Sequence, residues 1–198
     1  MKQFCLSVAA LALAVLTFVS CGDKQVSLQR VDPLEKLLPE TCWSHPYSEI
    51  EEVAAGEHAT FQFALRSPVD LEGLSLSFEA LKDEAGHVLE SVTTGFVDYI
   101  HVGRTTPDPG RDAIRSVSGM YPDAIIDDAK DWKVPGGKTQ PVWVSEAVPK
   151  DAAPGVYKGR VLVKGKGVKL RGEIGVKVYP VVLEEPTLWD NGIDLDPD

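Results

Sequence analysis

Apolar and polar residues alternate at every second position along several stretches of this chain of 198 residues. Ala59, Phe61, Phe63 and Leu65 form the clearest run, and shorter runs of the same kind follow toward the C-terminus. Extended segments are expected at 59–65, 74–78, 88–102, 142–144, 156–163 and 168–182. A period of two places one side of a strand on a core and the other toward water. The alternation therefore predicts β-strands with one buried face each.

Turn residues separate these runs, and helical periodicity is missing after the first 20 residues. Glycine-containing turns are expected at 82–86, 154–155 and 164–167, the last one closing a hairpin. Short helices are expected at most over 33–38 and 123–130. Antiparallel strands without βαβ alternation predict an all-β protein, an immunoglobulin-like antiparallel β-sandwich.

The first 22 residues resemble a bacterial lipoprotein leader. Lys2 precedes an apolar run from Phe4 to Val19, and Ser20, Cys21 and Gly22 follow. A lipobox of this kind predicts a lipoprotein signal peptide over 1–20, cleaved from the mature chain, and diacylglycerol on Cys21. Residues 21–30 would form a tether, and the protein would reside in the bacterial cell envelope, at the outer membrane. The alternative is an ordinary secretory signal that leaves Cys21 as a thiol.

The chain has three cysteines, which are too few for a disulfide framework. Cys5 lies in the leader, and lipidation of Cys21 would leave Cys42 without a partner. We therefore expect packing, not disulfides, to hold the domain together.

Charge excludes several classes of ligand. Lys and Arg total 20 against 30 Asp and Glu, so the formal net charge is -10. This charge argues against nucleic acid as a partner and disfavours polyanionic surfaces, although a local positive pocket remains compatible with it. Neutral sugars are also compatible. The four histidines are scattered and no nucleotide fingerprint is present, so neither a metal site nor a cofactor is expected.

Four segments carry a resemblance to a known family. They are GEHATFQF at 56–63, GFVDYIHV at 95–102, YPDAII at 121–126 and QPVWVSEAVPKDAAPGVYKG at 140–159. Together they resemble the N-terminal β-sandwich domain of glycoside hydrolase family 123 and its relatives in Bacteroidetes, over residues 31–185. Within the last segment, Trp143 and Tyr157 are expected to face each other across adjacent strands as core aromatics.

The resemblance implies that the catalytic machinery lies elsewhere. In that family a barrel follows the sandwich and carries an adjacent Asp-Glu pair that acts on N-acetylgalactosaminides. Residues 186–198 would be a tail or the truncated start of such a barrel, so no catalytic residue is expected in this chain. Asp83 and Glu84 match this pair only in residue type, because they are expected to lie in a turn. Four further acids are expected to form a solvated loop, with a calcium site as the alternative: Asp123, Asp127, Asp128 and Asp131.

The irregular, proline- and glycine-rich stretch from 103 to 134 is the candidate binding surface. Tyr121 and Trp132 in it are the candidate ligand-binding residues, because exposed aromatic rings stack on sugars; the alternative for Trp132 is packing over the sandwich. The predicted function is a non-catalytic surface lipoprotein module resembling the N-terminal domain of a β-N-acetylgalactosaminidase, with a glycan or a protein as partner. The alternatives are a truncated part of a family 123-like hydrolase and a purely structural surface lipoprotein.

Overall fold

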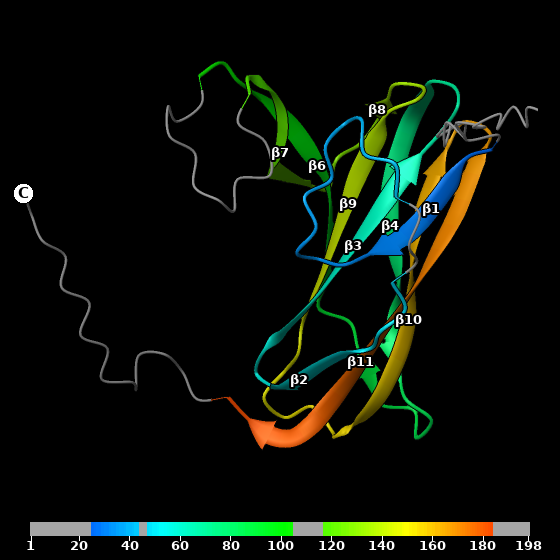
Figure 1. Cartoon of the computed structure of the whole chain (residues 1–198). Coiled ribbons are helices and arrows are strands. Elements are labelled where there is room, and N and C mark those ends of the chain that lie inside the picture. The colour runs from blue at the N-terminus through cyan, green and yellow to red at the C-terminus, as the bar shows by residue number, and fades with distance from the viewer. Residues whose placement is uncertain (1–24, 44–46, 105–116, 184–198) are drawn as a thin grey trace, which may run out of the picture.

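Two β-sheets face each other in the computed structural model, which describes residues 25–43, 47–104 and 117–183 (Figure 1). Sheet A contains five strands in the order β1-β3-β9-β6-β7, and sheet B has the order β2-β11-β10-β4-β5, with β8 paired to β4. The strands are β1 (Ser27–Val31), β2 (Glu51–Ala55), β3 (His58–Arg66), β4 (Leu71–Lys82), β5 (Val88–Leu89), β6 (Val92–Val102), β7 (Gly119–Asp127), β8 (Trp132–Val134), β9 (Thr139–Ala147), β10 (Gly155–Gly165) and β11 (Val168–Val182). The predicted all-β sandwich is confirmed.

The structure differs from the prediction in two respects. β2 runs parallel to β11, whereas every other pairing between the described strands is antiparallel. The described residues contain no helix, so the short helices considered at 33–38 and 123–130 are wrong. Most of the second range belongs to β7, where pairing with β6 satisfies its backbone groups.

The core between the sheets follows the alternation seen in the sequence. Ala59, Phe61, Phe63 and Leu65 on β3 are all buried in it. On β10 the alternating positions Tyr157, Val161 and Val163 are buried in the same cluster. Each fully buried large apolar side chain contributes roughly 1.5–3 kcal/mol to folding, so this core is the main stabilising feature.

Two of the predicted turns also form. The backbone carbonyl of Asp83 accepts a hydrogen bond from the N–H of Gly86, and its side chain accepts one from the N–H of His87. Gly86 has φ of 91°. β10 and β11 form a hairpin with Gly165 opposite Val168, and Gly167 in its turn has φ of 74°. Glycine occupies both positions because a side chain is strained there.

The stretch from 103 to 134 is more regular than predicted. Residues 105–116 lie outside the described residues, but β7 and β8 fill much of the remainder. β7 pairs with β6, and both extend away from the body of the sandwich (Figure 1).

The segment that follows β1 covers the outer face of sheet A. Gln62 donates from Nε2 to the carbonyls of Asp32 and Glu35, at 3.0 and 2.9 Å. Val31, Leu37 and Ala64 form a second, smaller buried cluster there. This part of the outer face of sheet A is therefore occupied by the chain itself.

The predicted contact between Trp143 and Tyr157 is wrong. Trp143 lies on β9 in sheet A, opposite Gln62 and Gly95 on the outer face, and is half-buried. Tyr157 lies on β10 in sheet B, is 1% exposed, and donates its hydroxyl to the carbonyl of Ala153 at 2.6 Å. The turn before β10 carries the chain from one sheet to the other, so these strands are not neighbours.

The predictions for the N-terminal region fall only partly on residues that the structure describes. Residues 1–24, which include the leader and Cys21, and residues 184–198 lie outside the described part. β1 begins at Ser27, so the last four residues of the predicted tether belong to sheet A. Cys42 is disulfide-bonded, which contradicts the expectation that lipidation of Cys21 leaves it alone. The other two cysteines of the chain, Cys5 and Cys21, lie outside the described residues. Among the described residues no helix is long and apolar enough to cross a membrane.

Candidate functional site

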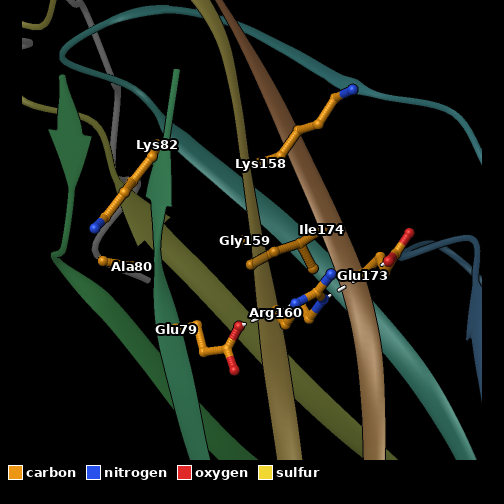
Figure 2. A pocket seen from close by; sticks show the side chains of 8 residues that line it. All are labelled: Glu79, Ala80, Lys82, Lys158, Gly159, Arg160, Glu173 and Ile174. Carbon is orange, nitrogen blue, oxygen red and sulfur yellow. Dashed lines mark hydrogen bonds and ion pairs between the residues drawn. The ribbon is translucent and has the colours of Figure 1, made fainter. Parts of the chain in front are cut away.

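A groove of about 570 Å³ runs over the outer face of sheet B, on the side opposite the core (Figure 2). β4, β10 and β11 supply its lining. The side chains that matter for its chemistry are Lys82, Lys158, Arg160, Glu79 and Glu173.

Two small residues, Ala80 and Gly159, also line the groove among the long charged ones. A Cβ atom at position 159 would lie 2.8 Å from the carbonyl oxygen of Glu79, so only glycine lets β10 approach β4 this closely. The register of these two strands also shifts between Lys158 and Arg160. A local bulge of this kind re-aims neighbouring side chains.

Arg160 links the two acids of the groove. Its Nη1 lies 3.4 Å from Oε2 of Glu79, and its Nε lies 3.7 Å from Oε1 of Glu173 (Figure 2). All three side chains are about half or more exposed. Two solvated carboxylates held by one guanidinium lack the contrasting environments of a catalytic acid and base.

Lys82 and Lys158 contribute positive charge to the lining of the groove. They lie directly opposite each other on β4 and β10, and their side chains extend away from Arg160 (Figure 2). No carboxylate in the described part of the chain pairs with either ammonium group. The arrangement can therefore bind an anionic group.

Trp132, a predicted ligand-binding residue, is held by the sandwich. Its ring stacks on Phe96 with centroids 5.2 Å apart and an interplanar angle of 6°. Its Nε1 donates to Oε1 of Gln140 at 3.1 Å, and the half-buried side chain packs against the main core. One face of the ring and its polar tip are thus engaged, which favours packing, and a ligand role for Trp132 stays a prediction.

Tyr121, the other predicted ligand-binding residue, lies on β7 opposite Ile100. It is half-buried, and its hydroxyl donates to the carbonyl of Val117 at 2.6 Å. The structure thus places Tyr121 and Trp132 on different strands, β7 in sheet A and β8 beside sheet B, and neither lines the groove. A ligand role for Tyr121 also stays a prediction.

The acidic candidates have structural roles or none. Asp83 accepts from the backbone N–H of His87 at 2.8 Å and lies 2.7 Å from its Nδ1, and this hydrogen bond lowers the pKa of Asp83. Asp128 and Asp131 have φ of 52° and 56°, as is common for aspartate in turns. Asp123 and Asp127 are exposed on β7. The described residues contain no group of three or more acids, cysteines or histidines able to hold a metal ion.

Glu146 is a buried acid that sequence reasoning missed. It points into the core from β9, between Ala59 and Val92, and is 0% exposed. Burial raises its pKa to about 7, although its Oε1 accepts from the N–H of Ser91 at 3.3 Å. Oε2 has no hydrogen-bond partner among the described residues. Its position in the alternation, with Val142 and Val144 on the same face, was a signal that it would be buried.

The groove was also missed, although the sequence held a signal for it. Lys158, Arg160 and Lys164 recur at polar positions of the predicted strand 156–163 and its end. Strand register alone shows that such residues share the outer face. What the sequence did not give was the neighbouring strand: the cross-strand partners of β10 are β4 and β11.

Fold and site together define a two-sheet β-sandwich module with a charged surface groove. The model of the glycoside hydrolase 123 N-terminal domain matches residues 45–165, more than half of the chain. This chain belongs to that domain family. No curated protein matches the sequence.

Solved structures agree with the fold. A family 123 glycoside hydrolase from Clostridium perfringens, studied for glycolipid glycan hydrolysis, matches with a TM-score of 0.66 and 14% identity. The match covers 82% of this chain and 28% of that enzyme, so this chain corresponds to a minor part of its length. At this identity the likeness shows the fold alone.

Two weaker matches support no argument. A putative membrane anchored protein from Corynebacterium diphtheriae gives a TM-score of 0.38 at 16% identity, covering 82% of this chain and 38% of that one. The CooA pilin subunit from enterotoxigenic Escherichia coli gives 0.34 at 11% identity, covering 78% and 95%.

Proposed function

We propose that the chain is a non-catalytic glycan-binding module of a family 123-type carbohydrate system, held on the bacterial cell envelope by a lipid on Cys21. Membership of the glycoside hydrolase 123 N-terminal domain family is the observation that carries this proposal. The groove supports a binding role, because the acids in it are tied to Arg160 and its two lysines are open to a ligand. The N-acetylgalactosaminides of the family are the first glycans to test.

Two assays on the purified chain test this role. We expect retention on immobilised glycans that carry N-acetylgalactosamine, and no release of chromophore from a chromogenic N-acetylgalactosaminide. Turnover of the chromogenic substrate would make the chain an enzyme. Absence of retention on every glycan would favour the structural lipoprotein instead.

The predicted ligand residues can be tested in the same retention assay. Tyr121→Ala is expected to weaken retention if its ring contacts sugar, and Trp132→Phe keeps the stack on Phe96 while removing the indole. Trp143→Phe is the matched control, because Trp143 is a half-buried tryptophan on the outer face of sheet A, outside both the 103–134 region and the groove. Unchanged retention for both variants would remove the 103–134 region from the proposal.

The lipid anchor has its own test. Incorporation of a labelled fatty acid into the protein in cells is expected to be lost in Cys21→Ser and kept in Cys42→Ser. Equal labelling of both variants would place the acyl group elsewhere, and no labelling of the wild type would favour the ordinary secretory signal.

A second candidate is that the chain is part of a longer hydrolase. The C. perfringens enzyme is several times longer than the part that matches. Apolar side chains on and beside β6 and β7 are also well exposed: Ile100, Val117, Met120, Ile125 and Ile126. Exposed apolar patches of this kind mark interfaces with other domains or proteins. A barrel-coding frame in the DNA downstream would favour this candidate, and an unrelated gene would favour the separate module.

A further inference from the structure

Positive charge is concentrated on one face of this acidic protein. Residues directly opposite one another on antiparallel strands share a face, so the register of β4, β10 and β11 defines which side chains lie outside. The cations on the outer face of sheet B are Lys82, Lys158, Arg160, Lys164, Lys169, Arg171 and Lys177. We call these seven residues the basic face. The chain as a whole has a net charge of -10.

Most of these cations lack a carboxylate partner. Arg160 pairs with Glu79 and Glu173, and Lys177 pairs with Glu52 at 2.9 Å. In the part of the chain that the structure describes, no acid pairs with the remaining five: Lys82, Lys158, Lys164, Lys169 and Arg171. The basic face therefore holds an uncompensated positive charge.

Cations oppose cations in two places on this face. Lys164 on β10 lies directly opposite Lys169 on β11, and Lys166 is in the turn that joins them. Lys158 likewise lies directly opposite Lys82 on β4, although the two side chains point away from each other (Figure 2). Like charges in opposite positions destabilise a sheet, and a bound anion would relieve that repulsion.

The shape of the face suits an extended ligand. Arg160 and Lys158, like Lys169 and Arg171, are two residues apart on one strand, a spacing of about 6.8 Å. Two adjoining depressions of about 570 and 520 Å³ on this face share Lys82 and Lys158 in their lining. The segment after β1 covers part of the outer side of sheet A, whereas six of the seven side chains of the basic face are exposed, all but Lys177.

The negative charge of the rest of the protein surface favours one kind of anionic partner over the others. A vesicle, or any other broad anionic surface, would also come close to the acidic remainder of the protein. Like charges repel each other there over the Debye length of about 10 Å at moderate salt. A linear polyanion can follow the basic face alone. We propose that the basic face of sheet B binds an anionic polysaccharide that carries sulfate or carboxylate groups. This inference rests on the proposed glycan-binding function and names the surface and the class of glycan.

Binding of chondroitin sulfate by the purified chain tests the inference, with unsulfated chondroitin and neutral dextran as comparisons. We expect retention on chondroitin sulfate at low salt, loss of it at high salt, and no retention on dextran. The double variant Lys164→Gln with Lys169→Gln should weaken binding by about tenfold. Lys36→Gln with Lys130→Gln is the matched control, because both lysines lie outside the basic face.

The outcomes distinguish a failure of this inference from a failure of the proposed function. Retention on neutral N-acetylgalactosamine glycans without retention on chondroitin sulfate overturns the inference and leaves the proposed function standing. Equal weakening by the two double variants also overturns it, because the effect is then one of net charge. Equally tight, equally Lys164-dependent binding to anionic phosphatidylglycerol vesicles or to polyglutamate would overturn it as well, by assigning the face to a membrane or to an acidic protein. Thermal unfolding of the variants confirms that each is folded.

Discussion

The ring of Phe63 lies directly over Gly172, and this contact joins the two sheets of the sandwich. A Cβ atom at position 172 would be 2.3 Å from Cε1 of Phe63 and 2.8 Å from its Cζ. Phe63 is 1% exposed on β3 of sheet A, and Gly172 is buried on β11 of sheet B. The absence of a side chain at 172 thus allows a large aromatic side chain to fill the core at this point.

Gly172→Ala should therefore destabilise the protein. The added methyl group forces the buried ring to move, and overpacking of this kind costs about 1–3 kcal/mol. Urea unfolding checks the expectation, with the exposed neighbouring substitution Arg171→Ala as the control. A variant as stable as the wild type would mean that the ring does not occupy this space.

Glu146→Gln should abolish a pH dependence of stability. The carboxyl group has a pKa of about 7 in the folded protein against 4.5 for the ordinary group. Between these values the unfolded chain ionises while the folded protein keeps its proton, so folding stability falls as pH rises from about 4.5 to 7. The loss is on the order of 3 kcal/mol and persists above that range.

The amide introduced by Glu146→Gln cannot ionise, so the variant should be more stable than the wild type at pH values above 7 and similar to it near 4.5. Urea unfolding across this range provides the measurement. Parallel stability curves for the two proteins would show that Glu146 does not titrate in the core.

Tyr99→Phe should loosen the segment that covers sheet A. The hydroxyl of the half-buried Tyr99 lies 2.9 Å from the carbonyl of Leu37 and 2.8 Å from that of Thr139. Removing it leaves buried carbonyls without this donor, at a cost of about 1–2 kcal/mol. Hydrogen exchange should increase in residues around Leu37 and stay unchanged in β10, and equal protection in both proteins would contradict the expectation.

Lys164→Glu should stabilise the β10–β11 hairpin. The new carboxylate would face Lys169 directly, so a repulsive pair becomes an attractive one. The thermal midpoint should rise by about 2 °C at low salt and by less at high salt. Lys36→Glu, which has no cation opposite it in a sheet, serves as the control. A lower midpoint for Lys164→Glu than for Lys36→Glu would argue against the repulsion.

Side-chain alternation alone was enough to predict the fold class and much of the core. Phe61, Phe63, Val161 and Val163 are buried as their positions require, because successive side chains of a strand point to opposite faces. The glycine turns at 86 and 167 were also predictable, since they depend on local backbone conformation. The four family motifs also predicted the likeness to glycoside hydrolase family 123, which the family match over residues 45–165 confirms.

Only the tertiary structure decided which strands are neighbours, and the candidate site depends on that. Trp143 and Tyr157 are close in sequence yet lie on different sheets, and Trp132 is held against Phe96, a residue 36 positions away. Lys82 lies opposite Lys158 because β4 pairs with β10 across more than 70 residues of chain. Local sequence sets the direction of each side chain, but the free energy of burying apolar faces together sets strand order. Strand order, in turn, brought the cations of β4, β10 and β11 onto one face of an acidic protein.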